Sequence, residues 1–255
     1  MRAILFSLVL FGVLLTSGTV SAGEVQVAVA ANFRPCLEEL VPLFQARTGH
    51  TVQVSVGSTG RHYAQIQAGA PFDIFISADV QHPRMLDKGG LTVPDSRFTY
   101  AQGRLVLWAP GLEFTADDSL TSILDDPGLT HLALANPRLA PYGYAARQTM
   151  RALQRWDRLQ DVLVQGQSVG QAWQFTASGN AQAAFVALAQ LDETSRQQSL
   201  LVPEIHHDPI NQQAVLLLKG GENPAAQAFL PFLRSDEARA VIAAHGYTLP
   251  TPAGR

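Results

Sequence analysis

Cysteine and charge are both scarce in this chain of 255 residues. A single cysteine excludes a disulfide framework and every zinc site that is built on several cysteines. Only 15% of the residues are charged, and 18 Lys and Arg stand against 21 Asp and Glu, a formal net charge of −3. Binding to a nucleic-acid backbone needs clustered excess cations, so this composition argues against a nucleic-acid partner. Hydrophobic residues make up 47% of the chain, which predicts a folded protein with a buried core.

The first 22 residues have the pattern of a secretory signal peptide. Arg2 gives a positive start, residues 3–15 are almost entirely apolar, and small residues lead to Ala22. We expect cleavage near Ala22, which removes the charge of Arg2 and moves the net charge from −3 to −4. A membrane anchor is the alternative, but the apolar run is shorter than the roughly 20 residues that cross a bilayer. The sequence therefore predicts an exported, soluble, periplasmic protein.

Short apolar strands alternate with helices along the rest of the chain. Hydrophobic periodicity predicts strands at 25–30, 51–56, 72–76, 104–108, 132–135, 162–164, 183–188 and 213–218. It predicts helices at 34–47, 61–68, 143–153 and 168–176, and a closing pair from 224 onward. This order indicates an α/β fold of two lobes, each a mainly parallel sheet flanked by helices. We expect residues 23–107 plus 212–255 to form lobe 1 and residues 108–211 to form lobe 2.

Small and neutral polar residues follow four of the predicted strands, just where a helix begins. These segments are 30–32, 57–60, 141–143 and 167–170. Ligands of open parallel sheets bind beyond the carboxyl ends of the strands, where helix amino ends point inward. Each helix start offers unpaired backbone N–H groups and a partial positive charge. Several such ends together predict a site for a small anion that needs no charged side chain.

Each of these residues also has an ordinary explanation. Ser, Thr and Asn are preferred helix N-caps, and Gly57 and Gly60 suit a turn without any ligand. The turn at 57–60 is not a P-loop, because no Gly-Lys-Ser/Thr sequence occurs there. Tyr142 taken alone could be a packed aromatic side chain. The anion-site hypothesis therefore rests on the recurrence of the pattern at four strand ends.

Enzymatic and metal sites are less well supported by the sequence. No Gly-x-Ser-x-Gly nucleophile turn is present. Residues 204–208 (EIHHD) are the densest group of metal-capable side chains, but they lack a helical His pair and are predicted to form a loop. Asp79 is interpreted as a cap of the next turn, and Cys36 as a small buried hydrophobe. Arg34 and Arg61 could steer anions toward the strand ends. We expect no catalytic residue, no cofactor and no directly bound metal cation.

Seven segments in this order resemble the periplasmic molybdate-binding proteins of ABC uptake systems. They are 27–33 (VAVAANF), 57–64 (GSTGRHYA), 69–79 (GAPFDIFISAD), 103–110 (GRLVLWAP), 136–143 (NPRLAPYG), 168–172 (SVGQA) and 185–190 (FVALAQ). The resemblance covers nearly all of the chain after the signal peptide. It implies the two-lobed type II periplasmic-binding-protein fold, with an oxyanion held in the cleft by side-chain and backbone donors.

The resemblance also implies which residues hold the ligand. The implied molybdate-binding set is Ala31, Asn32, Ser58, Thr59, Tyr142 and Val169. Many family members have Ser where this chain has Asn32, and some use a Tyr where this chain has Ala187. The side-chain amide of Asn32 would then replace a hydroxyl group, and Tyr142 would supply the phenol from the opposite loop.

The expected function is capture of molybdate, and of tungstate, by a monomer that delivers it to the permease subunits of an ABC importer. Neutral donors without an acid or acceptor partner would exclude protonated phosphate, and cavity size would separate molybdate from sulfate. Three alternatives remain open: a binding protein for another anion such as sulfate, an enzyme on the same fold, and a regulatory ligand-binding domain. The signal peptide and the lack of a DNA-binding segment argue against the last of these.

Overall fold

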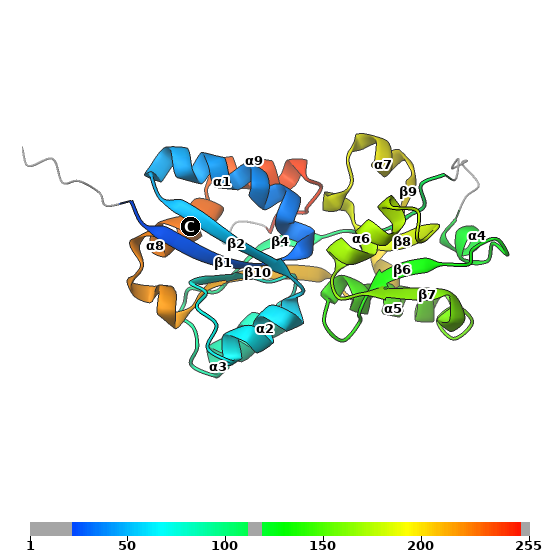
Figure 1. The fold of residues 1–255 in the computed structure, drawn as a ribbon, viewed down its shortest axis with the longest axis horizontal. Coiled ribbons are helices and arrows are strands. Elements are labelled where there is room, and N and C mark those ends of the chain that lie inside the picture. Colours follow the sequence, from blue (N-terminus) through cyan, green and yellow to red (C-terminus); the bar gives the residue numbers. More distant parts are fainter. Residues whose placement is uncertain (1–21, 112–118, 251–255) are drawn as a thin grey trace, which may run out of the picture.

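Two five-stranded sheets organise the molecule into two lobes (Figure 1). The computed structural model describes residues 22–111 and 119–250, so the predicted signal peptide lies almost wholly outside the described residues and its cleavage stays a prediction. The first sheet contains β1 (Glu24–Ala30), β2 (Thr51–Gly57), β3 (Ile74–Ile76), β4 (Phe98–Gly103) and β10 (Ile210–Leu216). The second contains β5 (Leu105–Trp108), β6 (Leu132–Ala135), β7 (Leu163–Gly166), β8 (Ala183–Ala187) and β9 (Ser199–Leu201).

The two sheets have matching topologies. Their strand orders are β2-β1-β3-β10-β4 and β7-β6-β8-β5-β9. In each sheet three neighbouring strands pair in parallel, and the fourth, β10 or β5, runs antiparallel to them. These reversed strands are the ones that enter a lobe from the other lobe. The carboxyl ends of the parallel strands face the cleft. A chain that enters a lobe from the cleft starts its strand at this edge of the sheet, so that strand runs antiparallel to the others.

The crossings between lobes lie a few residues before the expected boundaries. The sequence predicts residues 105–107 in lobe 1, but β5 pairs with β8 and β9 of the second sheet. It predicts residues 210 and 211 in lobe 2, but β10 already pairs with β4 of the first sheet there. The physical reason is that each strand forms as soon as the chain reaches the new sheet, and hydrophobic content alone does not mark that point.

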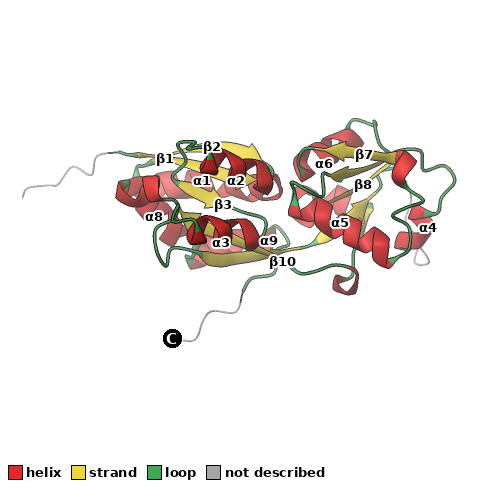
Figure 2. Ribbon diagram, turned by 90° about the horizontal axis from the view of Figure 1, so that it is seen from below, coloured by secondary structure: helices red, strands yellow, loops and turns green. Residues whose placement is uncertain are grey.

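Helices cover both faces of each sheet (Figure 2). Those of the first lobe are α1 (Arg34–Thr48), α2 (Thr59–Gln67), α3 (Gln81–Lys88), α8 (Pro224–Leu233) and α9 (Asp236–Ala244). Those of the second are α4 (Leu120–Leu124), α5 (Pro141–Ala152), α6 (Val169–Ala177) and α7 (Glu193–Gln197). Short 3-10 turns follow four of the strands: η1 (Ala31–Phe33), η3 (Leu188–Gln190), η4 (Glu204–His206) and η5 (Leu218–Glu222). Another, η2 (Gln160–Val162), precedes β7. The predicted helix at 143–153 begins already at Pro141, a residue that suits the first helical turn.

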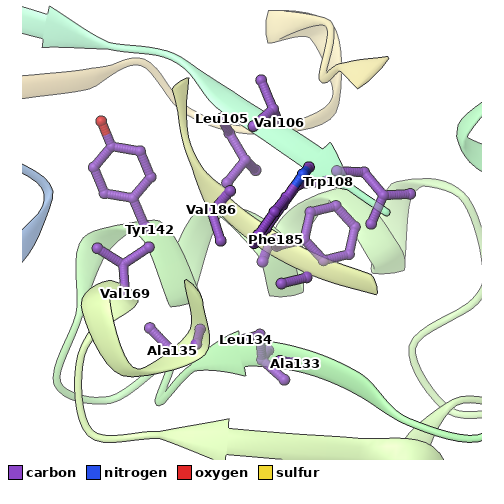
Figure 3. Close-up of a cluster of buried hydrophobic side chains, with 14 of the residues drawn as sticks. Leu105, Val106, Trp108, Ala133, Leu134, Ala135, Tyr142, Val169, Phe185 and Val186 are labelled. Carbon is purple, nitrogen blue, oxygen red and sulfur yellow. The ribbon is translucent and has the colours of Figure 1, made fainter. Parts of the chain in front are cut away.

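Each lobe has its own hydrophobic core. In the first lobe α8 packs on β1 and α1 on β2, and α9 packs against both helices. Phe44 of α1 and Phe229 of α8 are in edge-to-face contact within this core. In the second lobe Trp108 and Phe185 pack among strand residues, as Figure 3 shows. Tyr142 borders this second core, but its hydroxyl group points away from Trp108 and Phe185 (Figure 3). The fold therefore aims that hydroxyl group toward the other lobe.

Candidate functional site

One small cavity between the lobes brings together all six residues of the predicted ligand set. The space within it that the centre of a water molecule can reach is about 10 Å³. Those residues are Ala31, Asn32, Ser58, Thr59, Tyr142 and Val169, and the rest of the lining is Ala30, Gly57, Ala78, Ala140 and Pro141. Among the described residues, no charged side chain lines this cavity. The lobes also meet beside it, where the Gly60 N–H donates to the Leu139 carbonyl oxygen over 2.8 Å.

Ser58 presents a hydroxyl group that the protein itself does not use. It occupies the N-cap position of α2, but its side chain makes no capping hydrogen bond. The residue is only 4% exposed, and Oγ has no hydrogen-bond partner among the described residues. Buried hydroxyl groups nearly always have a partner, because an unpaired one costs roughly 1–3 kcal/mol. The ordinary explanation of Ser58 as a cap is therefore wrong, and its hydroxyl group is available to a ligand.

Thr59 is held in place by the strand opposite. It is the first residue of α2 and is completely buried. Its Oγ1 accepts a hydrogen bond of 3.0 Å from the Ala78 N–H, just after β3. A hydroxyl group that accepts in this way keeps its own hydrogen for another partner. Thr59 can therefore donate into the cavity while remaining fixed to the sheet.

The side chain of Asn32 is occupied by other parts of the first lobe. Its Nδ2 donates to Gln212 Oε1 over 2.8 Å and to the hydroxyl oxygen of Tyr247 over 3.0 Å. The Tyr247 hydroxyl donates in turn to the Asn32 carbonyl oxygen over 2.9 Å, so it must accept from Nδ2. Both amide hydrogens are thus engaged. The expectation that this amide replaces a hydroxyl ligand does not fit the arrangement, because no amide hydrogen remains.

Tyr142 carries its phenol from the second lobe to the wall of the first. It lies in the first turn of α5, is 1% exposed, and accepts a hydrogen bond of 3.2 Å from Gln212 Nε2. Burial raises the pKa of the Tyr142 phenol, and contacts with the side chains of Gln212 and Asn32 oppose that shift only in part. The phenol is therefore protonated at neutral pH and acts as a donor.

Three helices begin at this cavity. They are α2, α5 and α6, with Thr59, Tyr142 and Val169 in their first turns. The first N–H groups of a helix have no partner within the helix, and the helix amino end carries a partial positive charge of about half a unit. At α6, Ser168 caps the helix by accepting from the Gln171 N–H over 3.3 Å, which leaves Val169 beside the cavity. Neutral donors and helix ends together suit a small anion.

Comparison with known proteins identifies the family. The model of the family "Bacterial extracellular solute-binding protein" matches residues 25–248. The chain belongs to this family of solute-binding proteins. It is 45% identical over 231 residues to the molybdate-binding protein ModA of Azotobacter vinelandii, covering 89% of this chain and 91% of the relative. It is 44% identical over 227 residues to ModA of Rhodobacter capsulatus, covering 89% of each chain.

A solved structure agrees with these sequence relatives. The periplasmic molybdate-binding protein of Azotobacter vinelandii superposes with a TM-score of 0.83 at 42% identity, covering 89% of this solute-binding protein and all of that chain. The two-lobed α/β fold expected from the sequence is thus confirmed. None of the helices within 22–111 and 119–250 is both long and apolar enough to cross a bilayer.

Residues near the cavity that carry charge lie outside its lining. Arg34 and Arg61 line a larger groove beside it, and Arg34 pairs with Glu38 over 2.7 Å. Asp79 lies just before Val80, the N-cap residue of α3, and its Oδ1 accepts from the His82 N–H in the first turn over 3.0 Å. Within the two described segments, no group of three or more His, Cys, Asp or Glu residues is arranged to hold a metal ion.

Cys36 is fully buried, which confirms the sequence interpretation of a small buried hydrophobe. Burial, with a smaller contribution from Glu39, raises the pKa of its thiol. A thiol with a raised pKa is a poor nucleophile at neutral pH, because the reactive species is the thiolate.

Two residues that shape this site are not among those expected from the sequence. Gln212 is completely buried in β10 and contacts both Asn32 and Tyr142. Gly103, at the end of β4, lies against the Tyr142 hydroxyl, so that a Cβ there would overlap it. A glutamine at the start of an apolar strand was the available signal for Gln212. Gly103 begins the segment 103–110 that carries part of the family resemblance, but no role follows for it from the sequence, because β4 itself is not predicted.

Proposed function

We propose that this solute-binding protein captures molybdate, and also tungstate, in the interlobe cavity. The relatives that cover about nine-tenths of its length are named as molybdate-binding proteins. The observation that carries the proposal is the buried Ser58 hydroxyl, which has no hydrogen-bond partner in residues 22–111 and 119–250 and lies in a cavity lined by further neutral donors. A dianion with four oxygen acceptors would satisfy these groups together.

The donors available to such an anion come from both lobes. Ser58, Thr59 and Tyr142 offer hydroxyl hydrogens, and the backbone N–H groups at Asn32 and Val169 complete the proposed set, with Ala31 giving backbone only. Hydrogen bonds to an ionised group are about twice as strong as neutral ones and gain further where water is excluded. The helix amino ends of α2, α5 and α6 add favourable partial charge. The proposed binding therefore needs no lysine or arginine.

Selectivity follows from size and from the hydrogen-bond character of the lining. Sulfate has the same charge as molybdate but is smaller, so donors fixed for the larger ion would reach it less well. Hydrogen phosphate carries a proton that needs an acceptor. Asn32 Oδ1 is buried without a partner among the described residues, so a phosphate titration tests whether it can accept that proton.

Calorimetric titration with molybdate, tungstate, sulfate and phosphate tests the proposal directly. We expect one molybdate or tungstate ion per chain, bound tightly, and much weaker binding of sulfate and phosphate. Absence of oxyanion binding, or sulfate binding as tight as that of molybdate, would overturn the assignment. The second result would favour a binding protein for another oxyanion.

The proposed cellular role is delivery of the ion to the permease subunits of an ABC importer by a monomeric, periplasmic protein. The family match to bacterial extracellular proteins supports export. Export with cleavage near Ala22 would leave Gly23 as the first residue, which N-terminal sequencing of the periplasmic fraction can check. We propose no covalent chemistry, because the similar proteins are named for binding.

A further inference from the structure

Tyr142 reaches across the lobe boundary into a pocket of buried polar groups in the first lobe. Gln212 of β10 forms the floor of this pocket and is completely buried. Its Nε2 donates to the Tyr142 hydroxyl oxygen over 3.2 Å, a hydrogen bond between residues 70 positions apart in the sequence. This contact joins a residue of the first sheet to the helix that begins beside the cavity, so it can form only when the lobes are together.

The neighbours of Gln212 fix the direction of its side-chain amide. The hydroxyl group of Tyr100 and the Nδ2 of Asn32 both donate to Gln212 Oε1, each over 2.8 Å. Tyr100 is the residue that β4 leaves without a register partner where its pairing with β10 shifts between Gln212 and Gln213. Such an irregularity re-aims a side chain, here toward Gln212. With two donors on Oε1, the amide N–H₂ must face Tyr142.

We propose that Gln212 is a positioning residue that commits the Tyr142 hydroxyl group to donate into the cavity. A hydroxyl oxygen that accepts from Nε2 turns its own hydrogen elsewhere, and the anion of the proposed function is the strongest acceptor within its reach. Gln212 thereby contributes to affinity without touching the ligand. This inference rests on the proposed function, since it assigns a role in binding the same anion.

The substitution Gln212→Glu tests this role because it keeps the size of the side chain and changes the direction of one hydrogen bond. In its ionised form, the introduced carboxylate still accepts from Tyr100 and Asn32, but its second oxygen also accepts from Tyr142. The Tyr142 hydrogen is then withdrawn from the cavity, and a negative charge is added near the anion. Loss of one hydrogen bond to a charged ligand corresponds to roughly 10- to 100-fold weaker binding of molybdate at about pH 8.

Lowering the pH should restore the binding of this variant. In its protonated form, the introduced carboxyl group has one accepting oxygen and one donating O–H, which reproduces the pattern of the glutamine amide. Burial raises the pKa of such a carboxyl group, so recovery is expected on going to about pH 6. The nearby phenols of Tyr100, Tyr142 and Tyr247 do not titrate in this range, because burial raises the pKa of each.

Gln213→Glu is the matched control. Gln213 is the next residue of β10, but its side chain contacts Arg97 over 3.0 Å and Thr99 over 3.2 Å instead of the pocket. The same charge is thus added to the same strand away from Tyr142. We expect its affinity for molybdate to stay within about twofold of the unsubstituted protein, with no recovery at low pH.

Titrations of the three proteins with molybdate at the two pH values separate the outcomes. Weak binding by Gln212→Glu near pH 8 that recovers near pH 6, with Gln213→Glu unaffected, supports the inference. Binding by Gln212→Glu equal to that of the unsubstituted protein near pH 8, or weak binding that does not recover, overturns it. If the unsubstituted protein binds no molybdate, the proposed function itself fails.

Discussion

Substituting Gly103 by alanine should hinder the closure of the two lobes. Gly103 ends β4, immediately before the chain crosses to the second lobe. A Cβ at this position would overlap the hydroxyl oxygen of Tyr142 and press on the Gln212 amide. Tyr142 belongs to the other lobe, so the overlap with it exists only when the lobes are closed. Gln212 lies in the same lobe as Gly103, so when the lobes are apart only the end of this flexible side chain has to shift.

The expected size of the effect follows from the cost of overpacking. Forcing one extra methyl group into a filled site typically costs about 1–3 kcal/mol. Because only the closed, ligand-binding form bears the overlap with Tyr142, molybdate affinity should fall by roughly 5- to 150-fold. The melting temperature without ligand should fall only slightly, through the contact with Gln212, while the rise in melting temperature on adding molybdate becomes smaller. Calorimetric titration and thermal unfolding with and without molybdate measure both quantities.

Gly89→Ala serves as the control for a glycine-to-alanine change in the same lobe. A Cβ there would contact only carbonyl oxygens of α3, the nearest at 3.3 Å, far from the second lobe. Its affinity for molybdate should match that of the unsubstituted protein. Unchanged affinity in Gly103→Ala would refute the reasoning, as it would show that binding does not require Tyr142 against Gly103. A large fall in the melting temperature without ligand, with molybdate affinity little changed, would equally refute it, because the main conflict would then lie within the first lobe.

Three further predictions concern the cavity and its support. Tyr142→Phe removes one hydrogen bond to a charged ligand and should weaken molybdate binding roughly 10- to 100-fold; unchanged affinity in the calorimeter removes Tyr142 from the ligand set. Ser58→Ala should weaken molybdate binding by a similar factor without lowering the melting temperature. Ser168→Ala removes a helix cap and should instead lower the free energy of unfolding by about 0.5–2 kcal/mol. The reverse pattern contradicts the assignment of Ser58 to the ligand set. Burial lowers the pKa of His62, so the unfolded chain binds more protons, and stability should fall as the pH drops below about 6.5. Urea unfolding at about pH 7 and pH 5 measures how far the free energy of unfolding falls between the two pH values. The fall should be smaller in His62→Gln than in the unsubstituted protein, and an equal fall excludes His62 as a cause.

Much of the fold could be predicted because its signals are local. The strand at 25–30 and the helix at 34–47 were expected within a residue of the observed β1 and α1. Alternating or continuous apolar runs bounded by turn residues carry this information over short stretches of chain. By contrast, β4 was not predicted, because Phe98–Gly103 is mixed in character and becomes a strand only by pairing with β10 from the far end of the chain.

The candidate site divides in the same way. The strand ends pointed to residues such as Ser58 and Tyr142, since the carboxyl ends of parallel strands gather at one edge whatever the rest of the chain does. The hydrogen-bond partners of each side chain could not be predicted in that way. The amide of Asn32 is turned away by Gln212, 180 positions later, while Ser58 keeps a free hydroxyl at a place where capping is usual.

The α/β alternation, the low content of charge and the small polar residues at the strand ends all follow from the amino-acid sequence alone. These features depend on the period of hydrophobic residues and on the backbone chemistry of helix starts, both of which act over a few residues. The packing of the two lobes establishes which hydroxyl groups of the described residues have no partner, that the Asn32 amide is already hydrogen-bonded, and how Gly103 and Gln212 contact Tyr142. Those outcomes depend on hydrogen bonds and close contacts between distant segments, and such contacts exist only once the two sheets have formed and the lobes have come together.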